Sequence, residues 1–128
     1  MSAVVDASAL LCLLLDEPGA DTVAAVIRGA HISTVNVSES CSRGIERGAT
    51  IAAVLRAVER FELTVYPFDL QLARRTAELR APTKRAGIAL GDRACLALGE
   101  RLGTAVYTGD RRLAASALDI GIEVRLIR

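Results

Sequence analysis

The stretch LGDRACLALGERLGTAVYTGD, residues 90–110, contains a helix pattern, a turn and a strand pattern, with an aspartate near each end. Its first half is rich in alanine and leucine, which favour a helix, and Gly103 is a typical helix terminator. Residues 104–108 are β-branched and aromatic in character and predict a short buried strand. Asp92 falls where the helix is predicted to begin, and Asp110 lies at the carboxyl end of the strand, after Gly109. Strand ends and neighbouring helix starts lie at one edge of such a sheet, so we expect both aspartates there.

The same alternation of strand and helix patterns runs through the whole chain. The predicted strands are residues 3–5, 31–35, 63–66, 104–108 and 123–127, and the predicted helices are residues 9–16, 20–28, 36–47, 51–61, 70–81, 92–102 and 111–118. This alternation predicts an α/β domain, a three-layer sandwich in which helices flank a central, mainly parallel sheet. With no linker and no internal repeat, we expect residues 1–128 to form a single domain.

Polar side chains mark several predicted helix starts. Ser8, Thr50 and Asp69 each stand before an apolar periodic segment and are predicted N-caps. In the helix that follows Thr50, the spacing of Val54 and Leu55 predicts that both face the core.

The composition predicts a folded protein. The apolar fraction is 52%, which is too high for a disordered chain. The longest apolar run, residues 9–15, is far shorter than the roughly 18 residues of a membrane span, and no basic segment precedes it as in a signal peptide. Three cysteines without metal or redox spacing predict buried thiols in a reducing, cytoplasmic compartment, and a lone His31 predicts a structural role. The net charge of +1 neither requires nor excludes a polyanionic partner.

Four acidic residues stand where predicted strands end or helices begin. They are Asp6, Glu39, Asp92 and Asp110. At the carboxyl edge of a parallel sheet, where ligands bind, four carboxylates would repel one another unless they were protonated or neutralised. A hard divalent cation such as Mg²⁺ or Mn²⁺ resolves that conflict, because it prefers carboxylate and water oxygens. Caps, turns and helix dipoles are the alternative roles, and Asp6 fits them least because no basic residue lies near it in the sequence.

Four segments resemble the acidic motifs of PIN-domain ribonucleases, and specifically those of the VapC-type toxins of bacterial toxin–antitoxin pairs. They are VVDASAL (4–10), STVNVSES (33–40), LGDRACLALGERLG (90–103) and VYTGD (106–110). The resemblance implies a PIN-like fold in which Asp6, Glu39, Asp92 and Asp110 are catalytic and hold Mg²⁺, with Mn²⁺ as an alternative ion. It also implies that Ser8, Asn36 and Thr108 support these acids. Val35 departs from the family pattern, in which a smaller residue is common.

The resemblance further implies a metal-dependent endoribonuclease that hydrolyses phosphodiester bonds in single-stranded regions of structured RNA. Basic residues beside the motifs are candidates for binding RNA phosphates, although they could also form a solvated face: Lys84, Arg85, Arg93, Arg111 and Arg112. VapC-type toxins are usually cytoplasmic homodimers that a cognate antitoxin silences. Residues 20–28 and 51–61 are the candidate contact surfaces, although their apolar stripes could equally belong to the core. Cleavage of DNA by the same site stays open.

Other classes of protein fit the sequence less well. A phosphoacceptor receiver domain would have an acidic pair after the first strand and a lysine after the last, whereas the only lysine here is Lys84. No GxGxxG follows the first strand and no GxxxxGK[ST] occurs, which argues against a nucleotide-binding module. A serine or cysteine triad would need His31 at the site edge, but His31 begins a strand. A catalytically silent PIN-like module that binds RNA or protein stays the alternative.

Overall fold

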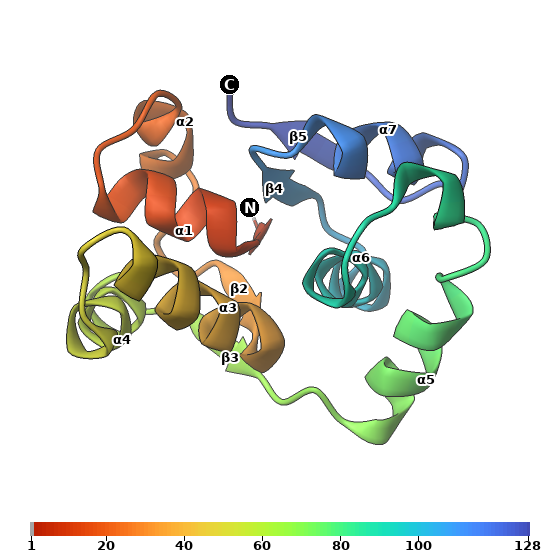
Figure 1. Cartoon of the computed structure of the whole chain (residues 1–128), viewed down its shortest axis with the longest axis horizontal. Helices are drawn as coiled ribbons and strands as arrows, with labels where there is room; N and C mark the ends of the chain where they lie inside the picture. Colours follow the sequence, from red (N-terminus) through yellow and green to blue (C-terminus); the bar gives the residue numbers. More distant parts are fainter. Residues whose placement is uncertain (1) are drawn as a thin grey trace.

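The computed structural model describes residues 2–128 and contains one sheet of five strands (Figure 1). The strands are β1 (Val4–Val5), β2 (His31–Ser33), β3 (Thr64–Tyr66), β4 (Val106–Thr108) and β5 (Val124–Leu126). Every pairing is parallel, in the order β3-β2-β1-β4-β5. Because strands are added first on one side of β1 and then on the other, a crevice forms where the carboxyl ends of β1 and β4 meet.

Helices cover both faces of this sheet. They are α1 (Ala7–Leu14), α2 (Ala20–Ala24), α3 (Thr34–Glu46), α4 (Ile51–Arg60), α5 (Leu70–Glu78), α6 (Leu90–Leu102) and α7 (Arg111–Leu118), with a short 3₁₀ helix η1 (Lys84–Ala86). In Figure 1, α1, α2 and α4 lie on one side of the sheet and α5, α6 and α7 on the other. Helix α3 follows β2 directly and packs against α1, α4 and α6. The predicted three-layer α/β fold is confirmed, with a wholly parallel sheet over residues 2–128.

The two residues of β1 show how the sheet divides the core. Val5 belongs to the apolar cluster under α1, α2 and α4, whereas Val4 belongs to the cluster under α5, α6 and α7. Neighbouring side chains of a strand point to opposite faces, so two consecutive valines fill both layers. Both valines are completely buried, as expected for a central parallel strand that helices cover on both faces.

Two predicted helix caps are confirmed, whereas the helices predicted to begin at residues 9, 36 and 92 each begin two residues earlier, at Ala7, Thr34 and Leu90. Thr50 and Asp69 accept backbone N–H groups at the starts of α4 and α5. Ser8 is not an N-cap, because α1 begins at Ala7 and the carboxylate of Asp6 caps it. Helix α6 begins at Leu90 rather than at Asp92. A carboxylate in the third position of a helix can reach back to an unpaired N–H ahead of it, which is the contact that Asp92 makes.

Helix α4 also differs from the prediction in the face that it buries. Val54 is completely buried as predicted, but 47% of Leu55 is exposed, and Ile51 is exposed to a similar degree. Helix α4 is an outer helix that contacts the rest of the protein along one narrow stripe, and Leu55 lies outside that stripe. The helices predicted over 20–28 and 70–81 are shorter in the structure, ending at Ala24 and Glu78.

The thiols and the histidine lie in structural positions. Cys12 and Cys95 are buried free thiols, and Cys41 is a half-buried one. His31 begins β2, at the opposite end of the sheet from the crevice, and its ring packs edge-on against Tyr66 with the centroids 5.4 Å apart. This position is incompatible with a catalytic triad at the crevice. Among residues 2–128, no helix combines the length and the apolar character that crossing a membrane would need.

Candidate active site

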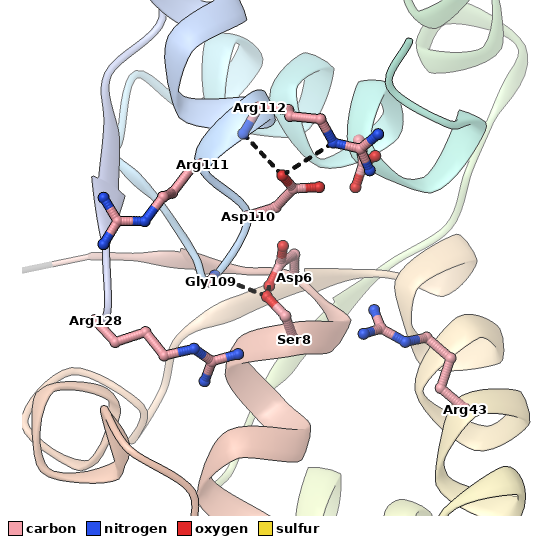
Figure 2. A pocket seen from close by; sticks show the side chains of 9 residues that line it. Asp6, Ser8, Arg43, Gly109, Asp110, Arg111, Arg112 and Arg128 are labelled. Atoms are coloured by element: carbon pink, nitrogen blue, oxygen red, sulfur yellow. Dashed lines mark hydrogen bonds and ion pairs between the residues drawn. The ribbon is translucent and has the colours of Figure 1, made fainter. Parts of the chain in front are cut away.

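The carboxyl ends of β1 and β4 open into a cleft of about 620 Å³ (Figure 2). Three of the four predicted acids line it, because Asp6 follows β1, Asp110 follows β4 and Asp92 lies in the first turn of α6. The full lining is Asp6, Ser8, Arg43, Asp92, Gly109, Asp110, Arg111, Arg112 and Arg128. The structure therefore brings together acids that lie about a hundred residues apart in the sequence.

Asp6 is the most buried of these acids, with 4% of its surface exposed. Its Oδ1 accepts hydrogen bonds from the Ser8 hydroxyl at 2.6 Å and from the Ala9 N–H at 2.9 Å. Its Oδ2 accepts from the Thr108 hydroxyl at 2.5 Å. Two hydroxyls and a helix N-terminus thus provide the partners that the sequence around Asp6 lacks.

The same two hydroxyls also hold the loop after β4. The Ser8 oxygen accepts the N–H of Gly109 at 2.9 Å, and the Thr108 oxygen accepts the N–H of Asp110 at 3.0 Å. Each hydroxyl therefore donates to Asp6 and accepts from the loop, so the carboxylate and the loop are held in one network. This places Ser8 and Thr108 directly beside the acid that the sequence predicts them to support.

Asp110 is also the N-cap of α7. Its Oδ1 accepts the N–H groups of Arg112 at 2.8 Å and Leu113 at 3.4 Å. The Arg112 guanidinium lies 3.7 Å from the same oxygen. The helix thereby fixes the orientation of this carboxylate at the edge of the cleft.

Glu39 lies beside the cleft rather than in its lining, in a neighbouring hollow with Val35 and Gly91. The Asn36 side-chain amide donates to Glu39 Oε1 at 3.3 Å and to the Gly91 carbonyl at 3.0 Å. Gly91 allows this close packing, because a Cβ atom there would lie 2.9 Å from Glu39 Oε1. Asn36 thus connects α3 to α6 and holds the glutamate against the first turn that carries Asp92.

The electrostatics of the cleft favour a positive ligand. Burial raises the pKa of Asp6, and its hydrogen bonds to Ser8 and Thr108 offset part of that rise. Burial raises the pKa of Asp92 to about 6, and the charges of Asp110, Glu39 and Asp6 add to the rise. Carboxylate oxygens that are partly desolvated and repel one another are the donor set that suits Mg²⁺ or Mn²⁺. Among residues 2–128, no group of three or more aspartate, glutamate, histidine or cysteine side chains is arranged closely enough to hold a metal ion without movement.

The predicted phosphate-binding residues lie in three places, only one of which is the cleft. Arg111 and Arg112 line the cleft, whereas Lys84 and Arg85 lie on η1, which packs against α7. Arg93 lies outside the lining of the cleft and turns towards α5, in its own layer of helices, where its guanidinium donates to the Thr76 carbonyl at 3.1 Å and joins α6 to α5.

Sequence reasoning missed two arginines of the cleft, Arg43 and Arg128. Arg43 lies four residues after Glu39, a spacing that places both on one face of a helix, and this signal could have identified it. Arg128 follows β5, and nothing in the local sequence connects it with the acids. Only the packing of β5 beside β4 brings it to the cleft.

Comparison with known proteins agrees with this architecture. Residues 3–118 match the family model of the PIN domain. No curated protein matches the chain significantly. VapC20 of Mycobacterium tuberculosis, described as a sarcin–ricin loop cleaving toxin, is 19% identical, with a TM-score of 0.74 over 89% of this chain and 94% of that chain.

Two structures from toxin–antitoxin systems match this chain over nearly its full length and nearly the full length of the matched chain. DNA-bound VapBC from Salmonella typhimurium is 21% identical, with a TM-score of 0.73, over 100% of this chain and 99% of that chain. VapBC-5 from Mycobacterium tuberculosis is 25% identical, with a TM-score of 0.64, over 99% of this chain and 98% of that chain. Because the family model covers most of the sequence and the fold agrees with these structures, the chain belongs to the PIN-domain family.

Proposed function

We propose that this protein is an Mg²⁺-dependent endoribonuclease and the toxin of a toxin–antitoxin pair. The observation that carries the proposal is the convergence of Asp6, Asp92 and Asp110 in one cleft, with Glu39 beside it and arginines around it. Membership of the PIN-domain family and the similarity of the fold to VapC toxins support it. Asp6, Asp92 and Asp110 would hold the cation, and Glu39 would hold it too or position the attacking water.

The bound cation would supply Lewis acidity, which lowers the pKa of water and neutralises charge on a phosphoryl group. The chain's own residues prepare the cleft for that chemistry. Ser8 and Thr108 hold the Asp6 carboxylate, the first turn of α7 holds Asp110, and Asn36 holds Glu39. Attack of water on the RNA phosphate displaces the 3′ oxygen and leaves a 5′ phosphate on the other fragment. The cation could be Mn²⁺ instead, since the same oxygen donors suit both ions.

The proposal is tested by cleavage of a cellular RNA pool, and of a DNA pool, with purified protein in Mg²⁺, Mn²⁺ or EDTA. The test variants are Asp92→Asn and Asp110→Asn, since asparagine can still accept the N–H groups that each carboxylate accepts. We expect discrete metal-dependent cuts in RNA and a loss of at least about a hundredfold in each variant, because each removes a charge from the proposed cation site.

Asp69→Asn is the matched control, because Asp69 also caps a helix but lies outside the cleft. We expect this variant to cut at the wild-type rate. Absence of cutting with any divalent ion, from folded protein free of antitoxin, would favour the catalytically silent binding module. Full activity of both cleft variants would mean that other acids carry the reaction.

The proposal includes a cytoplasmic homodimer and a cognate antitoxin. A hollow of about 500 Å³ between α1 and α4 is lined by Leu13, Leu14 and Phe61 among others, and α4 also exposes Ile51 and Leu55, which lie outside that lining. The apolar side chains of α2 and its following turn are in the core instead, so α4 is the better candidate surface of the two predicted. The mass of the purified chain alone in solution tests the homodimer. The mass after co-expression with the antitoxin tests the complex with that partner.

A further inference from the structure

We propose that Arg43 and Arg128 form a phosphate clamp, which binds the RNA backbone on both sides of the bond to be cut. This inference rests on the proposed function and assigns the two arginines that the sequence motifs leave out. In Figure 2 the two side chains approach Asp6 and Ser8 from opposite sides, Arg43 from α3 and Arg128 from the segment after β5. A strand that crosses the acids would pass between them.

Contacts with the backbone hold Arg128 in this position. One of its terminal nitrogens, Nη1, donates to the Pro18 carbonyl at 3.0 Å. Its guanidinium lies over Gly109, where an added Cβ atom would come within 2.9 Å of the other terminal nitrogen, Nη2. Gly109 is the loop residue whose N–H donates to Ser8, so the guanidinium is packed against the network that holds Asp6. An arginine that is held in place loses less side-chain freedom when it binds a phosphate.

Among residues 2–128, Arg43 and Arg128 are the cleft arginines that combine an unpaired charge with a side chain directed at the acids. Arg112 is paired with Asp110, and the Arg111 head group points away from Asp6 in Figure 2. Within residues 2–128, neither Arg43 nor Arg128 forms an ion pair with a carboxylate. Both side chains are exposed and can therefore reach a ligand.

The distribution of charge indicates where phosphates can bind. The centre of the cleft is acidic and repels a phosphate unless a cation is present, whereas the two arginines lie at its sides. A bound phosphodiester at the acids therefore leaves its neighbouring phosphates beside the arginines. Contacts to phosphates position a nucleic acid without reading its sequence, so the clamp would set the register of the strand rather than the choice of bases.

The test compares Arg43→Gln, Arg128→Gln and the double variant with Arg74→Gln, whose exposed side chain lies on α5, outside the lining of the cleft. Binding of a short fluorescent single-stranded RNA is measured in EDTA by anisotropy over a range of salt concentrations. We expect each cleft variant to weaken binding about fivefold and to lower the slope of log K against log salt by about 0.7. Arg74→Gln is expected to bind like the wild type.

Cleavage in Mg²⁺ gives a second readout. For each cleft variant we expect KM to rise about fivefold while kcat changes less than twofold, because the contact is present in both ground and transition states. An unchanged salt slope and unchanged KM would overturn the clamp while leaving the nuclease in place. Weakened RNA binding in a protein that never cuts would support the clamp and overturn the nuclease.

Gly109→Ala tests the placement of Arg128 without removing its charge. The new methyl group would displace the guanidinium, so we expect weaker RNA binding in the wild-type background and little further effect in the Arg128→Gln background. Thermal unfolding of both proteins checks that the loop still folds. Equal effects in the two backgrounds would mean that Gly109 acts independently of Arg128 and would contradict the packing role.

Discussion

Thr108 connects two of the acids through one buried hydroxyl, which donates to Asp6 and accepts from the N–H of Asp110. Thr108→Val preserves the shape of the side chain but leaves both of these polar groups without a partner. We expect the free energy of unfolding to fall by about 1–3 kcal/mol. We also expect at least about tenfold slower RNA cleavage, because Asp6 loses a hydrogen bond that keeps its pKa down and its carboxylate in place. Urea unfolding and the cleavage assay measure the two effects.

Two controls separate the hydrogen bonds from general damage to the core. Thr108→Ser keeps the hydroxyl and loses only a methyl group, so we expect it to retain most of the activity. Ser116→Ala removes another buried hydroxyl, one that donates to the Leu113 carbonyl in α7, away from the acids. It is expected to lose up to about 1 kcal/mol of stability and no activity. Equal activities for Thr108→Val and Thr108→Ser would show that the hydroxyl does not position Asp6.

The close approach of α3 and α6 depends on a glycine in the first turn of α6. Gly91→Ala would improve helix propensity by up to about 1 kcal/mol, but its Cβ atom would lie 2.9 Å from Glu39 Oε1. The flexible glutamate can move away at small cost, so we expect stability to change by less than about 1 kcal/mol. Because Glu39 is displaced from beside Asp92, we expect cleavage to fall at least about tenfold. Unfolding and cleavage, measured on the same preparation, test whether activity is lost while stability is kept.

Gly99 lies in the same helix, and its substitution is expected to lower stability without affecting cleavage. Its added Cβ atom would lie 2.5 Å from Val106 Cγ2, between α6 and β4 and on the far side from the acids. We expect Gly99→Ala to lose about 1–3 kcal/mol through overpacking while the folded fraction cuts RNA normally. If Gly91→Ala cut RNA as fast as the wild type, Glu39 would have no role at the cleft.

The charges of the cleft make the stability of the whole domain depend on pH in an unusual direction. The folded protein raises the pKa of Asp6 and raises that of Asp92 to about 6, so it binds protons more tightly there than the unfolded chain. The stabilisation that these two carboxyl groups contribute is therefore fully present below about pH 4, which is their pKa in the unfolded chain. It is lost as the pH rises through their higher pKa values in the folded protein. The lowered pKa values of Asp69 and Glu100 act in the opposite sense, but at more acidic pH.

In EDTA, we expect Asp92 alone to cost about 1 kcal/mol of stability between pH 5 and pH 7, after allowance for its partial exposure. Mg²⁺ should restore stability at pH 7 and have less effect at pH 5, because protonated carboxylates bind it poorly. Urea unfolding at both pH values, with and without Mg²⁺, measures this. Asp92→Asn should reduce the pH dependence and Asp69→Asn should not. A stability that rises between pH 5 and pH 7 in EDTA would contradict the burial and repulsion of these acids.

Most of the fold could be predicted from the sequence, because its signals are local. Apolar runs such as Val4–Val5, helix caps such as Thr50 and terminators such as Gly103 act within one or two turns of chain. The predictions were wrong where a neighbouring residue could make the same contact, or where no other element of the fold covered the residue. Asp6 took the cap position predicted for Ser8, because its carboxylate can accept both the Ser8 hydroxyl and the helix N–H. Leu55 has the spacing of a core residue, but no other helix covers it.

The sequence by itself determined the alternation of strands and helices and the positions of the acids after them, since periodicity and chain order are properties of neighbouring residues. Tertiary structure alone decided which side chains meet in the cleft. The pairing of β1 with β4 places Thr108 on Asp6, and the pairing of β4 with β5 brings Arg128 over Gly109. Thr108 and Asp6 are 102 positions apart in the sequence. Arg128 and Gly109 meet only because β5 pairs with β4. No local pattern of side chains encodes such distances.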